Sequence, residues 1–258
     1  MSDAWLRALV AFPFGLVVGS FMTVVVARVP AGESLVRPRS RCPSCGTPIR
    51  NRDNVPLFGW LLLRGRCRAC SAPISPVYPI VELTTAAVFA AAFAVADDPW
   101  VAVLLAAFLS LMPAITVIDV RHRIVPNRLM YPALVAFPAF VLVAAAAGAD
   151  VDVVRAAIGF AAFGGGLLLV ALVSGGMGMG DVKLAAVEGV VLGALGLRYV
   201  AVAAGAAILL GGVGAVVALL AGRDRKAAIP FGPYLAAGAV VAALWGEAIA
   251  SRYLDTIA

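Results

Sequence analysis

The chain has 258 residues, of which 63% are hydrophobic and 13% are charged, with a mean hydropathy of +1.01 and a net charge of +6. A chain this hydrophobic is not disordered, because disorder requires low hydrophobicity. Soluble domains have about a quarter of their residues charged, so the low charge content argues against a soluble globular domain. The composition favours a chain that crosses a membrane several times. We attribute the positive charge to membrane topology and predict no nucleic-acid partner.

The first apolar run, near 5–27, predicts a retained membrane span. It is longer than the core of a secretory signal peptide, and no A-x-A cleavage motif follows it. Further runs of about the length that a spanning helix needs lie near 78–96, 101–118, 129–148, 153–173, 182–197, 199–221 and 229–249. The sequence therefore predicts an all-α polytopic membrane protein with about eight transmembrane helices, of which the sixth and seventh are separated only by Arg198.

The distribution of basic residues predicts the orientation of these spans. If the N-terminus lies outside, 16 of the 20 lysines and arginines fall on the cytoplasmic side, among them Arg223, Arg225 and Lys226 between the last two spans. The positive-inside rule therefore favours both termini outside. The acidic turns at 97–98 and 150–152 then fall outside as well.

Residues 28–77, here called the cysteine module, are rich in Arg, Pro and Cys and contain no run long enough to span a membrane. All four cysteines of the chain lie there as two C-x2-C pairs, each followed by Gly or Ser and then by Pro: Cys42, Cys45, Cys67 and Cys70. Four thiolates suit one tetrahedral, structural zinc ion, and a segment too small to build its own core needs such a staple. A disulfide pair or redox-active thiols are the alternative, which the predicted cytoplasmic location disfavours.

Two aspartates stand at the ends of predicted spans. Asp119 ends the third span and Asp181 opens the sixth, so both fall at the cytoplasmic membrane boundary. Two carboxylates brought together there can share a proton and activate a water molecule for attack on an amide. This chemistry needs neither metal nor histidine, and His122 is the single histidine of the chain. The alternative for each aspartate is a helix cap or a topological charge.

Other residues near these positions are candidates for binding the substrate. Gly178 and Gly180 break the helix before Asp181 and let the backbone approach another helix or an extended substrate. Glu82 lies about one turn into the second span, and Glu188 lies on the same helix face as Asp181, where Lys183 could balance charge. The alternative for the two glutamates is a buried, hydrogen-bonded pair that stabilises the bundle.

Several motifs in sequence order resemble one known family over nearly the full length of the chain. They are GLVVGSFMTVVVARVP, the segment from RSRCPSCGTP to SPVYPIVEL, IDVRHRIVPNRL and GMGMGDVKL. In these motifs the chain resembles the bacterial prepilin peptidases, the type IV leader peptidases with a GxGD aspartyl active site.

The resemblance implies that Asp119 and Asp181 are the catalytic pair of an aspartic endopeptidase. The substrate would be the leader of a prepilin or pseudopilin, cut at the cytoplasmic face of the bacterial plasma (inner) membrane after a glycine. The four cysteines would bind zinc. Many members with such a module also methylate the new N-terminus, using S-adenosylmethionine. The implied domains are a first transmembrane helix (1–27), the cysteine module (28–77) and a peptidase bundle (78–258).

The chain departs from the family pattern at a few positions. Thr23, Asn51 and Arg52 lie in or beside the region associated with methylation, so the resemblance implies cleavage more directly than methyl transfer. Arg121 stands where some members have a second aspartate, which leaves Asp119 as the candidate in its motif. Asn127 replaces an aspartate often found after the proline, a replacement that the resemblance implies is tolerated.

Two other functions compete with a peptidase. A polytopic bundle with broken helices and carboxylates also suits a transporter or channel, although both aspartates are expected at the membrane edge and no inverted repeat is evident. A catalytically silent assembly factor, docking a partner through the cysteine module, is the second. It predicts that the aspartates tolerate substitution and that the cysteines do not.

Overall fold

A computed structural model describes residues 2–222 and 230–257 of the chain. In these residues no β-strand occurs, and two isolated β-bridges are the only extended pairing. The predicted cytoplasmic charges Arg223, Arg225 and Lys226, and residue 229 at the start of the last predicted span, lie outside the described residues. The elements are α1 (Ser2–Arg28), η1 (Asn51–Asp53), α2 (Phe58–Leu62), α3 (Val77–Val95), α4 (Pro99–His122), α5 (Asn127–Ala146), α6 (Val153–Gly159), η2 (Phe160–Gly164), α7 (Gly165–Ser174), α8 (Met179–Leu195), α9 (Leu197–Leu220) and α10 (Gly232–Ile257).

Within the described residues, seven helical segments are long and apolar enough to cross a membrane. They are Asp3–Arg28, Val77–Val95, Pro99–His122, Asn127–Ala146, Val153–Ser174, Leu197–Leu220 and Gly232–Thr256. The sixth predicted span corresponds to α8, which has 17 residues because Gly196 ends it one residue before α9 begins. The all-α polytopic class is therefore confirmed, and the protein is an integral membrane protein.

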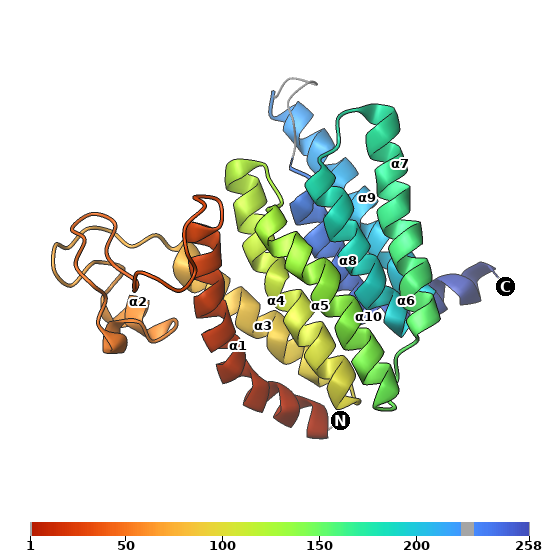
Figure 1. Cartoon of the computed structure of the whole chain (residues 1–258), viewed down its shortest axis with the longest axis horizontal. Coiled ribbons are helices and arrows are strands. Elements are labelled where there is room, and N and C mark those ends of the chain that lie inside the picture. Colours follow the sequence, from red (N-terminus) through yellow and green to blue (C-terminus); the bar gives the residue numbers. More distant parts are fainter. Residues whose placement is uncertain (1, 223–229, 258) are drawn as a thin grey trace.

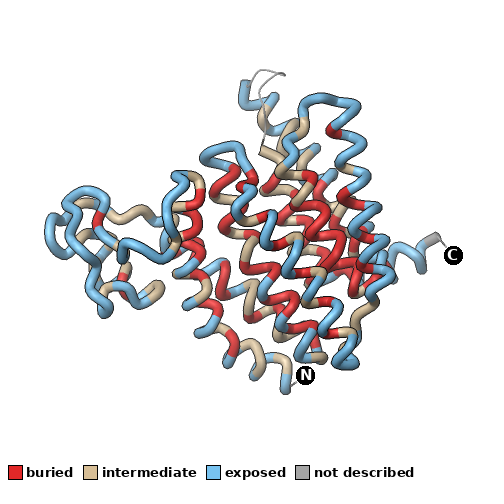
Figure 2. Tube along the Cα trace, viewed as in Figure 1, coloured by how far each residue is buried: buried red, intermediate tan, exposed pale blue. Residues whose placement is uncertain are grey.

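The short helix α8 lies at the centre of the bundle. All residues from 184 to 194 are buried, and α8 contacts α4, α5, α6, α7, α9 and α10. Figure 2 shows this buried strip within a bundle whose outer surface is largely exposed. The exposed surface is rich in large apolar side chains such as Val135, Leu172 and Leu209, as expected of a surface that faces lipid tails.

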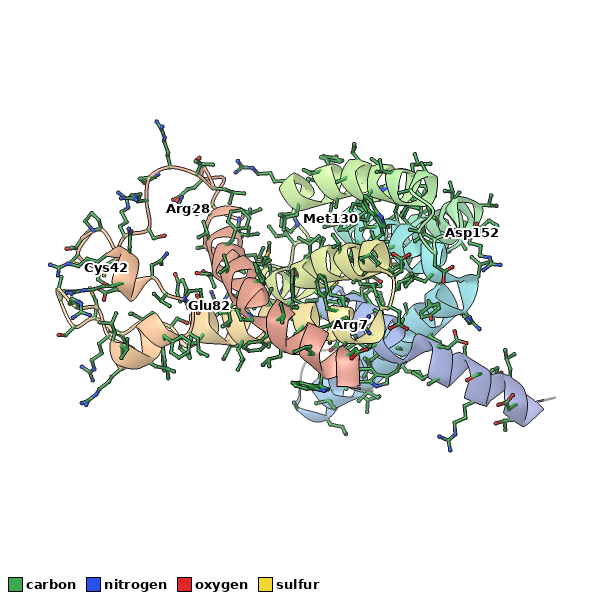
Figure 3. All side chains as sticks on the ribbon, turned by 90° about the horizontal axis from the view of Figure 1, so that it is seen from below. Arg7, Arg28, Cys42, Glu82, Met130 and Asp152 are labelled. Atoms are coloured by element: carbon green, nitrogen blue, oxygen red, sulfur yellow. The ribbon has the colours of Figure 1, made fainter. Side chains whose placement is uncertain are left out.

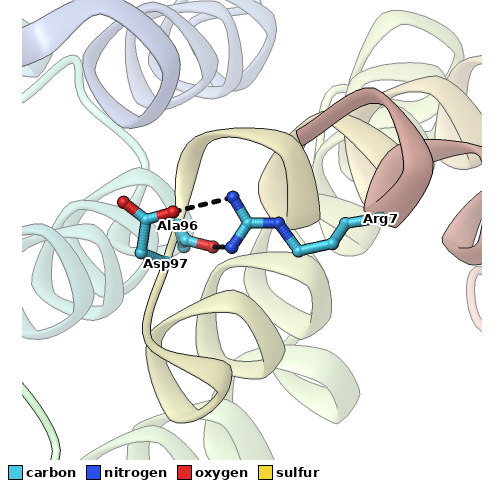
Figure 4. Close-up of polar contacts among 3 residues, drawn as sticks. All are labelled: Arg7, Ala96 and Asp97. Carbon is cyan, nitrogen blue, oxygen red and sulfur yellow. Dashed lines mark hydrogen bonds and ion pairs between the residues drawn. The ribbon is translucent and has the colours of Figure 1, made fainter. Parts of the chain in front are cut away.

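The connections between helices lie at two ends of the bundle. The α4–α5 and α7–α8 connections lie at the same end as the C-terminal end of α1, here called the module end (Figure 1). At the opposite end the Arg7 guanidinium donates to the Ala96 carbonyl oxygen at 2.9 Å and to the Asp97 carboxylate at 2.7 Å, which ties α1 to the α3–α4 turn (Figure 4). Asp98 caps α4 by accepting hydrogen bonds from the N–H groups of Trp100 and Val101.

The cysteine module leaves the bundle at the end of α1 and returns at the start of α3. It projects sideways, beyond α1, and does not cover the ends of the other helices (Figure 1). The same lateral position is visible from below in Figure 3, where Cys42 lies far from the bundle.

Candidate active site and metal centre

Asp119 lies in the last turn of α4 and is 4% exposed. Its Oδ2 accepts a hydrogen bond of 2.9 Å from the backbone N–H of Gly232, the first residue of α10. The start of a helix carries partial positive charge, so this contact stabilises a negative charge on Asp119. The chain leaves α4 through Arg123, whose left-handed conformation directs its N–H to the Asp119 carbonyl oxygen at 2.8 Å.

Asp181 lies in the first turn of α8 and is half-buried. Its backbone N–H donates to the carbonyl oxygen of Gly178, the residue that caps α8. Gly178 itself is exposed, and a Cβ there would come 3.2 Å from Oδ2 of Asp181. The carboxylate of Asp181 is therefore reachable from solvent beside the glycine-rich turn.

Val125, in the α4–α5 connection, brings the segments that carry the two aspartates together. A Cβ on Gly180 would come 2.8 Å from the Cβ and the carbonyl oxygen of Val125, so only glycine lets α8 approach this closely. A Cβ on Gly232 would meet a Val125 methyl group at 3.3 Å and Oδ2 of Asp119 at 2.8 Å. The α4–α5 connection, the start of α8 and the start of α10 thus meet at one residue.

This packing places Asp119 and Asp181 in one site at the module end of the bundle. Gly232, which lies against the Asp119 carboxylate, and Gly180, the residue before Asp181, both lie against Val125, so the two aspartates are neighbours. One carboxyl is buried against a helix start and the other is half-buried beside an exposed turn. Such a pair can divide the roles of base and acid around one water molecule.

Lys183 contacts polar groups of α5, not a carboxylate. Its ammonium donates to the amide oxygen of Asn127 at 2.6 Å and lies 4.6 Å from the centre of the Tyr131 ring. No ion pair of Lys183 occurs in the described part of the chain. The space beside Gly180 is likewise filled by Val125 of the chain itself, so Gly180 has a packing role in this structure.

Glu82 lies at the junction of the bundle and the cysteine module, as labelled in Figure 3. Its Oε2 accepts a hydrogen bond of 2.7 Å from the backbone N–H of Leu57, and Gly19 of α1 lies directly against it. Glu82 therefore fastens the cysteine module to α3.

Glu188 is fully buried in α8, and neither of its carboxyl oxygens has a hydrogen-bond partner among the described residues. It lies seven residues, about two helical turns, after Asp181 in α8. The alternative in which Glu82 and Glu188 form a hydrogen-bonded pair is wrong, because Glu82 bonds to Leu57 and Glu188 has no such partner among those residues.

Gly232 and Val125 contact the site residues but were not predicted from the sequence. The segment Pro230-Phe231-Gly232-Pro233 offered a signal, because a glycine between prolines at a helix start marks a special backbone position. No pattern in the sequence indicates that Val125 packs against glycines of two other helices.

The four cysteines form one cluster in which all four Sγ atoms lie within 4.8 Å of one another. None of them forms a disulfide. Around a tetrahedral zinc ion the sulfur atoms would be about 3.8 Å apart, since the Zn–S bond is about 2.3 Å. The Sγ atoms of Cys42 and Cys70 are 3.9 Å apart, so the cluster could hold a metal ion of this size.

The two C-x2-C pairs have the same backbone shape. Gly46 and Ser71, which follow the second cysteine of each pair, both have positive φ, of 70° and 59°. Their N–H groups donate to the carbonyl oxygens of Cys42 and Cys67, both at 2.9 Å. An isolated β-bridge closes each turn. The two halves of the cluster are therefore equivalent turns, here called knuckles.

The thiols of the cluster differ in acidity. The Thr47 hydroxyl and backbone N–H stabilise the thiolate of Cys45 and lower its pKa to about 6. The N–H of Ala72 favours the thiolate of Cys70, but the neighbouring thiols and burial outweigh this effect and raise its pKa to about 11. Four sulfur atoms this close cannot all carry negative charge without a cation between them, and a bound metal ion would supply that charge.

Comparison with known proteins identifies the family. The family described as "Bacterial Peptidase A24 N-terminal domain" matches residues 14–96, and the "Type IV leader peptidase family" matches residues 104–220. A protein of Aeromonas hydrophila named prepilin leader peptidase/N-methyltransferase is 34% identical, with 97% of this chain and 94% of the relative covered. This chain belongs to the type IV leader peptidase family.

Other leader peptidases of the family are similarly close. Relatives with the same name from Bacillus subtilis (strain 168) and Pseudomonas aeruginosa are 34% and 33% identical, covering 95% and 93% of this chain and 97% and 91% of the relatives. No solved structure matches the chain significantly. The resemblance seen in the sequence motifs is confirmed, and it favours a leader peptidase over a transporter or a silent assembly factor.

Proposed function

We propose that this protein cleaves the leader peptide of type IV prepilins or pseudopilins, using Asp119 and Asp181 as its catalytic pair. The observation that carries the proposal is the meeting of the α4–α5 connection, α8 and α10 at Val125, in a chain that belongs to this family. The packing holds two carboxyl groups of distant helices in one site at one end of the bundle.

The surroundings of the two carboxyls suggest how they divide the work. Gly232 and the start of α10 stabilise charge on Asp119, so we assign Asp119 as the base that takes a proton from water. Asp181, half-buried, is the acid that protonates the carbonyl oxygen of the scissile amide. The water oxygen bonds to the carbonyl carbon and gives a tetrahedral gem-diol. The C–N bond then breaks as the leaving nitrogen takes the proton that Asp119 accepted, and the carbonyl group re-forms as one hydroxyl returns its proton to Asp181.

Residues around the pair fit the binding of an extended backbone. Gly178 is exposed next to Asp181 and leaves room where a side chain would crowd Oδ2. Lys183, two residues after Asp181, contacts Asn127 and Tyr131. This group of polar side chains suits contact with a leader peptide. Glu82, Glu188 and Gly180 have other neighbours, so we leave them out of the proposed substrate site.

We propose that the cysteine cluster binds one structural zinc ion through Cys42, Cys45, Cys67 and Cys70. The spacing of the sulfur atoms and the matching backbone shape of the two knuckles support this. When bound, the ion would cross-link two halves of a segment that has little apolar core of its own.

The names of the relatives support a second activity, methylation of the new N-terminus with S-adenosylmethionine. Thr23 is relevant to this activity because it departs from the family pattern in the region associated with methylation. It is buried in α1, and its hydroxyl donates to the Ser20 carbonyl oxygen at 2.7 Å. The hydroxyl is thus committed within its own helix.

The protein is proposed to lie in the bacterial plasma membrane with both termini outside and the module end in the cytoplasm. The exposed arginines of the cysteine module and of the α4–α5 connection support this orientation, because they all lie at one end of the bundle. The prepilin leader would then be cut at the cytoplasmic face.

Co-expression with a prepilin and intact-mass measurement of that prepilin tests the proposal. Wild type should remove a leader-sized mass, whereas Asp119→Asn and Asp181→Asn should not. Asp97→Asn, which changes an exposed aspartate at the opposite end, is the matched control and should process normally. Processing by either site variant would overturn the assignment, and a further gain of one methyl group with wild type would support methylation.

A further inference from the structure

Helix α2 of the cysteine module exposes a compact apolar surface. Phe58, Leu61 and Leu62 are 56%, 53% and 77% exposed, and they make up most of this five-residue helix. A small soluble module gains nothing from exposing three large apolar side chains in one turn, and such patches mark interaction sites.

A hydrogen bond fixes the depth at which α2 lies. Leu57, the residue before α2, donates its N–H to Glu82 at 2.7 Å. Glu82 lies five residues into the spanning helix α3, which is about 7.5 Å along a helix with a rise of about 1.5 Å per residue. Gly19, packed against Glu82, lies nine residues before the end of α1, or about 13 Å below it. The start of α2 therefore lies beside the first turns of α3 and the last turns of α1, within the length of both spanning helices.

The surroundings of α2 are strongly basic. The cysteine module holds nine arginines and two acidic residues, Glu33 and Asp53. Asp53 is paired with Arg68, and its pKa is lowered mainly by that hydrogen bond. Seven arginines are exposed and form no ion pair with any described residue: Arg37, Arg39, Arg41, Arg50, Arg52, Arg64 and Arg66.

We propose that the cysteine module rests on the lipid bilayer beside the bundle, with Phe58, Leu61 and Leu62 inserted among the lipids and its unpaired arginines on anionic headgroups. Three observations select this partner. The module projects sideways from the bundle, beyond α1 (Figures 1 and 3), where lipid would surround a spanning helix. The helix is pinned at membrane depth by Glu82. Arginines lie before and after α2 in the chain, at 50, 52, 64 and 66, and apolar residues combined with nearby basic residues are typical of helices that lie in a membrane interface.

In this arrangement the Leu57–Glu82 hydrogen bond holds the start of α2 at the lipid surface. Leu57 has a φ of 62°, which an L-residue seldom adopts, and this turn directs the chain into α2 at the membrane level. Glu82 would hold the cysteine module at α3, and α2 would hold it at the bilayer. The cysteine cluster would then keep a fixed depth near the module end of the bundle. This inference concerns lipid contact and stands apart from the catalytic assignment.

Hydrogen–deuterium exchange of the full-length, zinc-loaded protein in nanodiscs tests the inference. Amides of Phe58–Leu62 should exchange at least about tenfold more slowly in wild type than in Phe58→Ser/Leu61→Ser/Leu62→Ser, because lipid excludes water from them. The control, Phe58→Leu/Leu61→Met/Leu62→Met, keeps the apolar face and should exchange as wild type does. Equal exchange in wild type and the serine variant would overturn the inference.

A second measurement uses wild type alone and does not depend on the folding of a variant. Exchange of α2 should be slower in nanodiscs of phosphatidylcholine mixed with phosphatidylglycerol than in phosphatidylcholine alone, since the arginines recognise anionic headgroups. Equal exchange in the two lipids would overturn the headgroup contact. Protection that arises only after a prepilin is added would assign the surface to the substrate and would also overturn the inference.

Discussion

Gly180 is the residue at which packing and catalysis are most closely joined. It lies one residue before Asp181 and touches the backbone of Val125, which follows Asp119 in the α4–α5 connection. A side chain added at this position would meet Val125 and would push the start of α8 away from the α4–α5 connection. The distance between the two aspartates therefore depends on a residue that takes no part in the chemistry.

Replacement of Gly180 by alanine should reduce leader cleavage strongly. The new Cβ would lie 2.8 Å from Val125 Cβ and carbonyl oxygen, so the start of α8 must shift. A misplacement of about 1 Å in an active site can cost about a hundredfold in rate, so we expect a loss of at least about tenfold. Cleavage of a prepilin by the purified variant, followed by mass spectrometry, measures it.

Gly176→Ala is the matched control for this change. Gly176 lies in the connection just before α8, and the nearest atom to its added Cβ is a carbonyl oxygen 3.9 Å away. The control should cleave as wild type does. Equal activity of the Gly180 and Gly176 variants would show that the contact with Val125 does not hold the site together.

Glu188 should limit the stability of the bundle. A buried polar group without a hydrogen-bond partner costs about 1–3 kcal/mol, and both oxygens of Glu188 lack one among the described residues. Glu188→Met, which keeps the length of the side chain, should therefore raise the thermal midpoint by a few degrees in detergent. A lower midpoint would mean that the Glu188 carboxyl has a stabilising partner, and Glu247→Met, at an exposed carboxylate, serves as the control.

At the scale of elements, the cysteine module is a loop whose shape depends on its cluster. The knuckles at Cys42–Gly46 and Cys67–Ser71 have few apolar contacts, and Cys42 is the only buried hydrophobic residue between α1 and α3 apart from Val29. The remaining links are the Arg68–Asp53 ion pair and hydrogen bonds such as Trp60 Nε1 to the Ile74 carbonyl oxygen at 3.2 Å. Loss of the metal should therefore loosen the module without unfolding the bundle.

Cys67→Ser should lower the zinc content of the purified protein from about one ion per chain to near zero, because four thiolates are needed to complete the site. Elemental analysis of the purified protein gives the stoichiometry. Ser44→Ala, inside the first knuckle but not a ligand, should retain the metal. A full zinc complement in Cys67→Ser would contradict the four-cysteine site.

The elements show which parts of the site the sequence could predict. The aspartates and cysteines could be predicted because each stands in a short sequence motif, whereas the partners of these residues come from elsewhere in the chain. Gly232 reaches Asp119, and Leu57 reaches Glu82, only through tertiary packing. The sixth predicted span differed from α8 for a similar reason, since the helix already begins at Met179 and its polar first turn holds Asp181.

At the scale of the whole molecule, the positions of the charges predict the topology. Acidic residues dominate the turns at the end opposite the module, where Asp98 also accepts a hydrogen bond from the Asp150 N–H at 3.1 Å. Basic residues dominate the module end. We expect a periplasm-active alkaline phosphatase fused after Ala258 to be active and the same enzyme inserted in the α4–α5 connection to be inactive. The reverse pattern would contradict the proposed orientation.

The central claim is that Asp119 and Asp181 together cleave the leader. The most direct measurement is the rate of leader release from a purified prepilin by the full-length protein in nanodiscs, read by intact mass. General acid–base catalysis contributes about 10²–10⁴-fold, so Asp119→Asn and Asp181→Asn should each lose at least about a hundredfold in rate, with Asp97→Asn unchanged. A folded, zinc-loaded Asp119→Asn or Asp181→Asn variant that cleaves at the wild-type rate would contradict the account.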